Sequence, residues 1–248
     1  MNPKGSKKVS ILIPVYNREK YLESCIQSAL DQTFADIEVV VTDNASTDGT
    51  WEICQRFAAQ DERVRVFRNE TNVGPVRNWL RCVSEARGEF SKILFSDDTL
   101  APECIAQMLE AMDNPEVAFA YSTVNIGPGE AESQLTYQTR QGPLVPARDY
   151  VKLILHGHAP YSPGAILLRT DDLRRNLRLD FNTALKRRYA DHGAGPDLMI
   201  SLLTLMEYRF AAYIDQPLVF SAPTAALSLL PMLVTKCSTA TGRSSAFF

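Results

Sequence analysis

Residues 9–17 read VSILIPVYN, an apolar run of strand length that passes directly into polar residues. A continuous apolar run of this length suits a parallel strand that is covered on both faces. Residues 19–32 follow, with apolar side chains at helical spacing. A buried strand followed by a helix begins a strand–helix–strand unit, so this stretch predicts a parallel sheet.

The same alternation continues through the first half of the chain. The predicted strands are Ile37–Thr42, Val64–Phe67, Phe90–Phe95 and Val117–Val124, and the predicted helices are Ser46–Gln60, Val76–Ala86 and Pro102–Met112. This order predicts an α/β fold with an open, Rossmann-like, mostly parallel central sheet and helices on both faces. Ligands of such sheets bind beyond the carboxyl ends of the strands, so we expect a site in the loops that follow them.

The pattern changes after residue 125. We expect a hairpin arm at Ser133–Arg140, a helix at Arg148–His156, a strand at Gly164–Arg169, an apolar helix at Leu198–Tyr208 and a closing strand at Phe210–Val219. We therefore divide the chain into residues 1–125, residues 126–221 as a second half of the same domain, and residues 222–248 as an atypical tail. The tail contains no acidic residue. Three interpretations of the tail compete: foremost a segment packed on the core, then an aberrant end such as one from an altered reading frame, then a membrane-surface or partner contact.

The composition excludes several classes of protein. The formal net charge is −3, so no overall positive field would draw the chain to nucleic acid. No stretch approaches the about 18 apolar residues of a membrane-spanning helix, and the polar start does not resemble a signal peptide. The five cysteines are widely spaced without a CxxC pair. We therefore expect reduced thiols and a cytoplasmic protein rather than a zinc site.

The loop after the first strand excludes two common nucleotide-binding designs. Pro14-Val15-Tyr16-Asn17 stands where a dinucleotide-binding protein would have GxGxxG and a phosphate-loop protein would have GxxxxGK[ST]. Neither pattern is present, so dehydrogenases and P-loop enzymes are disfavoured.

The loop after the second strand, residues 42–50, reads TDNASTDGT. Asp43 emerges there at a strand end, where its carboxylate can accept a hydrogen bond from the imide N–H of uracil or thymine, a donor that cytosine lacks. Ser46, Thr47 and Asp48 also fit a helix-capping cluster, because they offer oxygens to free helix N–H groups. We expect Asp48 to act mainly as a cap.

Two adjacent carboxylates, Asp97 and Asp98, follow the fourth strand in the segment FSDD. Like charges side by side are costly unless a cation or sugar hydroxyls compensate them, and a hard divalent ion that also binds a diphosphate would do so. The alternative is a solvated turn that caps the next helix. In the segment NVGPVRN, Arg77 lies in the first turn of a helix and can reach a base or phosphate, unless it is simply a surface arginine.

Together these pieces resemble the family 2 glycosyltransferases of the GT-A fold. The segments IPVYN, VVTDNASTDGT, NVGPVRN and FSDD occur in the family's order and at its usual separations. The resemblance is strong over residues 8–125, weakens through residues 126–221 and is absent beyond. It implies an inverting sugar transferase that uses nucleotide sugars, with donor binding in residues 1–125 and acceptor binding with the catalytic base in residues 126–221.

The resemblance also implies roles for individual residues. The implied donor-binding set is Pro14, Tyr16, Asn17, Asp43, Asn44, Arg77, Asp97 and Asp98. Within it, Asp43 binds the base, and Asp98 ligates Mn²⁺ or Mg²⁺ together with the diphosphate. The family usually has one more aspartate two residues before the pair, where this chain has Phe95, so metal binding rests more heavily on Asp98.

The catalytic base of the family normally begins an apolar helix in the second half. Asp197 occupies that place here, although Pro196 replaces the usual glutamate, and Asp191 is the reserve candidate. The alternative for Asp197 is a first-turn carboxylate favoured by the helix dipole. Family members often carry a late histidine near the metal, and at that place this chain reads Phe220-Ser221-Ala222-Pro223.

The implied activity is metal-assisted transfer of a sugar from a UDP- or dTDP-sugar to a glycan or lipid-linked acceptor. Guanine stays open as the base, as do peripheral contact with the inner face of the cell membrane and the oligomeric state. The alternatives are a non-catalytic nucleotide-sugar-binding protein and a sugar nucleotidyltransferase. His156 and His158 form an HxH pair without a nearby acidic residue or cysteine, so we expect a loop near the acceptor rather than a metal site.

Overall fold

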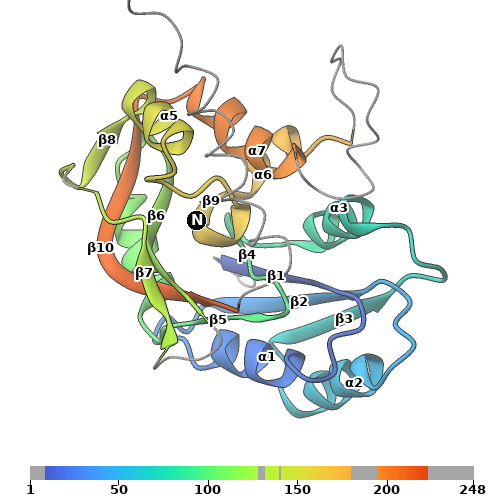
Figure 1. The fold of residues 1–248 in the computed structure, drawn as a ribbon. Coiled ribbons are helices and arrows are strands. Elements are labelled where there is room, and N and C mark those ends of the chain that lie inside the picture. The colour runs from blue at the N-terminus through green and yellow to red at the C-terminus, as the bar shows by residue number, and fades with distance from the viewer. Residues whose placement is uncertain (1–8, 128–131, 140, 180–194, 223–248) are drawn as a thin grey trace, which may run out of the picture.

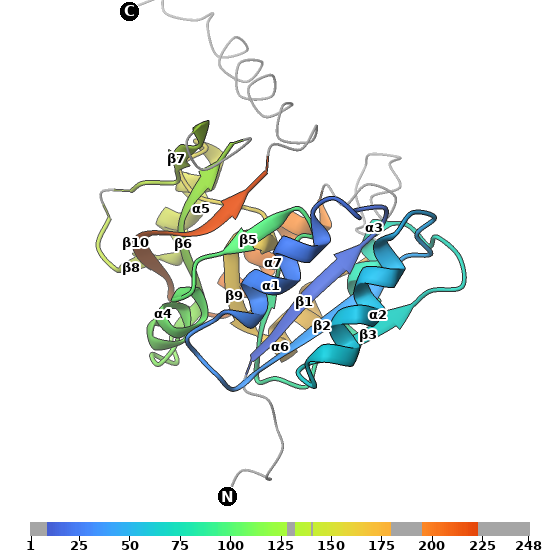
Figure 2. The same cartoon turned by 90° about the horizontal axis from the view of Figure 1, so that it is seen from below.

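The computed structural model describes residues 9–127, 132–139, 141–179 and 195–222, which build one ten-stranded sheet covered by helices (Figures 1 and 2). The first half contains β1 (Val9–Val15), α1 (Leu22–Leu30), β2 (Ile37–Asp43), α2 (Thr50–Gln60), β3 (Val64–Arg68), α3 (Pro75–Glu85), β4 (Phe90–Ile93), β5 (Asp98–Leu100), α4 (Cys104–Ala111) and β6 (Val117–Ile126). The second half contains β7 (Gln134–Thr136), β8 (Leu144–Pro146), α5 (Ala147–Leu155), the 3₁₀ helix η2 (Pro163–Ala165), β9 (Ile166–Arg169), α6 (Thr170–Asn176), α7 (Pro196–Leu205) and β10 (Phe210–Ser221).

The sheet is mostly parallel, as the sequence predicts. Its strand order is β3-β2-β1-β4-β9-β6-β10-β5, with β7 paired to β6 and β8 paired to β10. The neighbouring strands β3, β2, β1 and β4 are all parallel, and so are β6 and β10. β9 runs antiparallel between β4 and β6. The two halves of the chain therefore share a single sheet.

Side chains that alternate along the strands enter two separate cores. Ile11 and Ile13 belong to the core under α1, α2 and α4, whereas Leu12 and Val40 belong to the core under α3, α6 and α7. Figure 1 shows α1 and α2 on one side of the sheet and α3, α6 and α7 on the other. Because successive strand residues point to opposite faces, a strand covered on both sides must be apolar throughout. This explains the continuous run in β1.

Several predicted boundaries are wrong, and they are wrong next to the site. The helix expected at residues 19–32 covers only Leu22–Leu30, and the helix expected from Ser46 begins at Thr50. The strand expected at residues 90–95 ends at Ile93, and a separate strand, β5, starts at Asp98. At the starts of α1 and α2, hydrogen bonds between loops hold the chain out of the helix. Between β4 and β5, the Asp98 N–H donates to the Phe95 carbonyl oxygen at 2.9 Å and closes a turn. Helix α6 was not expected.

Strand β10 ties the second half to the first half's polar loops. It pairs with β6 along its length and then runs antiparallel to β5, with Ser221 opposite Asp98. The expected hairpin arm appears as β7, which pairs with β6.

Predicted features outside the sheet have mixed outcomes. Cys25, Cys54, Cys82 and Cys104 are buried free thiols, as expected. Within the described ranges no helix has the length and apolar character needed to cross a bilayer. Cys237, Asp191 and residues 223–248, which make up nearly all of the tail, lie outside the described residues.

A buried polar cluster holds together the amino ends of the strands. Glu38, only 2% exposed, accepts hydrogen bonds from the Ser10 hydroxyl (2.7 Å) and the Arg87 backbone N–H (2.6 Å). It also pairs with Arg65 at 2.9 Å, and Arg65 donates in turn to the Glu85 carbonyl oxygen. A buried carboxylate is tolerated only with such a full set of partners.

We predict that Glu38→Ala lowers the free energy of unfolding by about 3 kcal/mol, because it removes the buried acceptor that the Arg65 guanidinium, the Ser10 hydroxyl and the Arg87 N–H share. Glu23→Ala removes an exposed carboxylate that pairs with Arg56, and it should cost about 0.5 kcal/mol. Urea denaturation of both variants measures the difference. Equal losses would show that the buried cluster contributes no more than a surface pair.

Candidate functional site

The expected loops meet at one edge of the sheet. β1, β2 and β4 are parallel, with Val15 opposite Asp43 and Leu12 opposite Ile93. The segments that follow these strands therefore start side by side, and they carry Tyr16-Asn17, Asn44 and the Asp97-Asp98 pair. Pro14 is buried at the end of β1, and Tyr16 beside it is 40% exposed.

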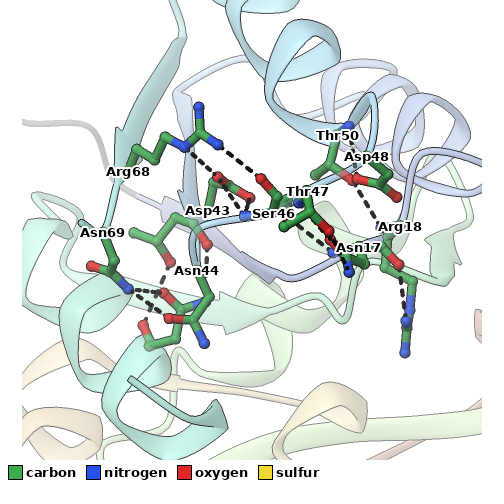
Figure 3. A network of polar contacts seen from close by, with 12 residues as sticks. Asn17, Arg18, Asp43, Asn44, Ser46, Thr47, Asp48, Thr50, Arg68 and Asn69 are labelled. Atoms are coloured by element: carbon green, nitrogen blue, oxygen red, sulfur yellow. Dashed lines mark hydrogen bonds and ion pairs between the residues drawn. The ribbon is translucent and has the colours of Figure 1, made fainter. Parts of the chain in front are cut away.

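Hydrogen bonds join the loop after β1 to the loop after β2 (Figure 3). The Asn17 backbone N–H donates to the Ser46 hydroxyl (3.0 Å), and the Asn17 side-chain oxygen accepts from the Thr47 N–H (2.9 Å). The Arg18 N–H donates to the Thr50 hydroxyl (2.8 Å). Asn17 has φ 50°, a left-handed conformation that asparagine tolerates better than most residues. These contacts explain why α1 and α2 start later than their sequences suggest.

Asp48 satisfies a free N–H at the start of α2, as expected of a capping carboxylate, although the N-cap residue itself is Gly49. Its carboxylate accepts from the Thr50 N–H (3.1 Å) at the start of α2 and from the Glu19 N–H (3.3 Å) in the other loop. In turn, the Glu19 carboxylate accepts a hydrogen bond from the Gly49 N–H (2.8 Å). Asp48 thereby both caps α2 and fastens the two loops.

Asp43 has no exposed surface and is held by an ion pair that the sequence analysis missed. Its carboxylate accepts from the Ser46 N–H (3.2 Å) and pairs with Arg68 Nε at 3.1 Å. Arg68 also donates to the Ser46 carbonyl oxygen (2.8 Å) and lies over the Trp51 ring at 5.2 Å. Asp43 and Arg68 are register partners at the ends of β2 and β3, so opposite charges at the ends of adjacent parallel strands were the available signal.

Asn44 is buried, and every described hydrogen bond of its side chain goes to protein. Its oxygen accepts from Asn69 Nδ2 and the Val73 N–H, both at 3.0 Å, and its nitrogen donates to Asn72 Oδ1 at 2.9 Å. Asn69 Nδ2 also donates to Asn78 Oδ1 (2.9 Å). Asn44 thus fixes the loop before α3, and its contact with a donor stays a prediction.

Arg77 lies on the exposed surface of the first turn of α3. That helix begins after Gly74, whose φ of 85° favours glycine, and Pro75 occupies the first turn. Within the described residues Arg77 makes no hydrogen bond or ion pair, so its guanidinium is available to a ligand.

Asp98 is buried beside the last residues of β10. It is 6% exposed, and burial raises its pKa to about 7, although the Ser221 hydroxyl and the Ala222 N–H counteract this. Asp97 is more accessible and faces Arg18, with 3.8 Å between Oδ2 and Nε. Ser221 therefore lies beside Asp98, in the segment that corresponds by sequence to the late histidine of the family.

The described side chains around Asp98 offer few ligands for the predicted metal ion. Among the described residues, no group of three or more His, Cys, Asp or Glu side chains could hold a metal ion. Asp98 is nevertheless a buried carboxylate with an unfavourable charge, which a hard cation would stabilise. The residues fit an ion that takes most of its ligands from a diphosphate and water, rather than one held by protein alone. His156 and His158 are exposed and belong to no such group.

Asp197 lies in the first turn of α7, which runs from Pro196 to Leu205 rather than over the expected residues 198–208. Its Oδ1 accepts from the N–H groups of Gly195 and Leu198, both at 2.7 Å, and it is partly exposed. Gly195 has φ 117°, a conformation that favours glycine. Burial raises the pKa of Tyr161, and the negative charge of Asp197 adds to that effect, so the phenol lies within electrostatic range of the carboxylate.

Lys92 is a second charged residue that the sequence analysis did not single out. It lies in β4, has no exposed surface and donates through Nζ to the carbonyl oxygen of Gly164. Burial lowers the pKa of Lys92, and the nearby Cys104 and Asp98 partly oppose this effect. A lysine inside an apolar strand was the available signal.

Comparisons with known proteins agree with the fold and extend over both halves. The profile of Glycosyl transferase family 2 matches residues 10–177. Glycosyltransferase GlyG from Streptococcus pneumoniae is 35% identical over 111 residues, which are 45% of this chain and 37% of that protein. The chain spans less than half of the length of the first curated relatives that it matches.

Two solved structures show the same fold. The crystal structure of S. aureus TarS in complex with UDP has a TM-score of 0.70 at 20% identity, covering 96% of this chain and 67% of that one. Mannosyltransferase PcManGT from Pyrobaculum calidifontis, in complex with GDP-Man and Mn²⁺, has a TM-score of 0.59 at 18% identity, covering 97% and 66%. The family profile covers well over half of the chain, and the fold is that of these transferases. The protein belongs to glycosyl transferase family 2 and has the GT-A fold.

Proposed function

We propose that the protein is an inverting glycosyltransferase that moves a sugar from a UDP- or dTDP-sugar to a hydroxyl of a glycan or lipid-linked acceptor. The observation that carries the proposal is that Asp43, at the end of β2, and the Asp97-Asp98 pair, at the start of β5, lie at the same edge of the sheet. Family membership and the UDP complex of TarS support it.

Asp43 is proposed to bind the nucleobase. Its partner Arg68 stabilises the ionised carboxylate, which accepts from an imide N–H such as that of uracil. Because Asp43 has no exposed surface in this structure, base binding requires neighbouring side chains to move. Pro14, Tyr16, Asn17 and Asn44 would then shape the nucleoside pocket, and Arg77 would contact base or phosphate.

Asp97 and Asp98 are proposed to bind the sugar-diphosphate part. Asp98 would hold Mn²⁺ or Mg²⁺ together with the diphosphate, and Asp97 would lie near the ribose and sugar. When bound, the ion neutralises charge on the departing nucleoside diphosphate. The Mn²⁺ in the PcManGT complex supports a metal in this fold.

Asp197 is proposed as the base. Its carboxylate takes the proton of the acceptor hydroxyl as that oxygen forms a bond to the anomeric carbon. The bond from that carbon to the diphosphate oxygen breaks on the opposite face, so the configuration inverts and the nucleoside diphosphate leaves with the bonding electrons. The proposed setting is the cytoplasm, with peripheral contact at the membrane where lipid-linked acceptors occur.

A screen for hydrolysis of nucleotide sugars separates this proposal from the two alternatives. A transferase releases UDP and free sugar slowly without any acceptor. A non-catalytic binding protein releases nothing, and a nucleotidyltransferase releases sugar phosphate and a nucleoside triphosphate only when pyrophosphate is added. Either of the latter results would contradict the proposal.

We predict that UDP binds about 10-fold more tightly than CDP, because cytosine lacks the imide donor for Asp43. Asp43→Asn should remove most of this preference, since an amide can present a donor as well as an acceptor. Isothermal titration with each nucleotide in the presence of Mn²⁺ measures the ratio. Unchanged selectivity in the variant would exclude Asp43 as the base-reading group.

Asp98→Asn should weaken Mn²⁺-dependent UDP binding by about 10-fold and slow transfer by about 100-fold, because the carboxylate that shares the ion is lost. Chelation with EDTA should abolish wild-type transfer, and Mn²⁺ should restore it. Asp36→Asn, at an exposed position before β2, is the matched control and should change neither value. Wild-type transfer that survives both EDTA and Asp98→Asn would refute the metal assignment.

Asp197→Asn should lower kcat by about 100-fold or more while the Kd of UDP stays unchanged, because only proton removal from the acceptor is lost. Asp171→Asn changes another first-turn carboxylate, on α6, where it pairs with Arg174 at the surface, and it should leave kcat unchanged. Steady-state transfer kinetics and nucleotide titration give the two values. An active Asp197→Asn variant would contradict the assignment of Asp197 and favour Asp191, the reserve candidate, as the base.

A further inference from the structure

Lys92 is an unusual residue for the interior of a sheet. It lies in β4 between β1 and β9, five residues before Asp97, and has no exposed surface. Its ammonium donates to the carbonyl oxygens of Gly164 and Ile93, the latter at 3.4 Å. Among the described residues, no carboxylate lies within 4.0 Å of it to form an ion pair. A buried ammonium with so few partners is expensive, and replacing such a group with an apolar residue is often neutral or stabilising. Lys92 is therefore poorly explained by stability alone.

The carbonyl that Lys92 holds belongs to a short segment, residues 160–165, which we call the strap. At one end of the strap the Tyr150 hydroxyl donates to the Pro160 carbonyl oxygen at 2.6 Å. At the other end, Lys92 binds Gly164, and a Cβ on Gly164 would lie 2.8 Å from Phe95 Cδ2. The strap backbone is thus pressed against the residue that stands two positions before Asp97.

The strap also reaches the proposed base. Its 3₁₀ helix, η2, packs against both β4 and α7, the helix whose first turn holds Asp197. Tyr161, the second residue of the strap, lies close enough to Asp197 for the charge of that carboxylate to help raise the pKa of the phenol. A single segment therefore runs from Phe95, two residues before Asp97, to the helix that carries Asp197, and Lys92 holds one of its ends.

We infer that Lys92 is a positioning residue, whose buried ammonium fixes the strap and so sets the alignment of Asp197 with the Asp97-Asp98 pair. This inference rests on the proposed function. Phe95 is part of the same device, because its ring occupies the space beside Gly164 and also packs on Trp79 at 5.5 Å between ring centroids. The residue that replaces the family's additional aspartate thus serves as the surface on which the strap rests.

Lys92→Met tests the inference, because it keeps the length of the side chain and removes the donor. We expect the Kd of UDP with Mn²⁺ to stay within about 2-fold and Tm within about 5 °C, while kcat for transfer falls by about 10-fold or more. Transfer should also fall more than donor hydrolysis, because water is a smaller and more mobile acceptor. Lys152→Met, at an exposed position on α5, is the control and should match the wild type.

Hydrogen–deuterium exchange gives a readout that needs no activity. In Lys92→Met the amides of residues 160–166 should exchange faster, and those of β1 should be unchanged. Unchanged exchange in the strap, unchanged kcat, or a loss confined to UDP affinity would each overturn the inference. Absence of donor hydrolysis and transfer in the wild type would instead overturn the proposed function, and the exchange result would still decide whether Lys92 fixes the strap.

A second pair of variants covers the case in which Lys92→Met does not fold. Gly164→Ala places a methyl group against Phe95 and should displace the strap, which gives the same loss of kcat with UDP affinity retained. Phe95→Leu combined with Gly164→Ala removes the clash and should restore at least half of the lost activity. A double variant as impaired as the single one would overturn the inference.

Discussion

Parallel pairing of β1 with β2 and β4 brings the carboxyl ends of three strands to one edge of the sheet. Parallel strands need a long connection to return to the starting edge, and here helices supply it, so both faces of the sheet are buried. Apolar side chains fill those faces, which leaves the loops beyond the strand ends as the places where polar residues can gather. Asp43 and the Asp97-Asp98 pair lie at such strand ends because the sheet leaves little other room for them.

Buried charge at that edge is compensated in two different ways. Asp43 has Arg68 beside it, so its carboxylate is paired within the protein. Burial, together with the negative charge of Asp97, raises the pKa of Asp98 to about 7, against the opposing effects of the Ser221 hydroxyl, Lys92 and the Ala222 N–H. The difference matches the proposed roles, because a base-reading carboxylate needs a fixed orientation, whereas a carboxylate that shares a cation gains its compensation from the ligand.

Because the long strand β10 pairs with β5 and β6, residues from both halves of the chain contribute to the edge of the sheet that carries the candidate site. It places Ser221 opposite Asp98, and no pattern in residues 1–125 indicates that partner. The strap and α7 both belong to the second half of the chain, and α7 carries the proposed base, Asp197. The proposed donor and acceptor functions are thus separated along the sequence but would be built on one continuous sheet, so a small movement of the strap would alter their alignment.

The sequence by itself determined the fold class, the family and the loops of the site, because a strand buried on both faces must be apolar and the motifs directly follow such strands. The starts of α1 and α2, the break between β4 and β5, and the contacts of Arg68 and Lys92 were decided only by the tertiary structure. Each depends on a contact between segments far apart in the chain, such as Asn17 with Ser46 or Lys92 with Gly164. Local pattern carries no information about such contacts, since the free energy that fixes them exists only when the sheet has brought the partners together.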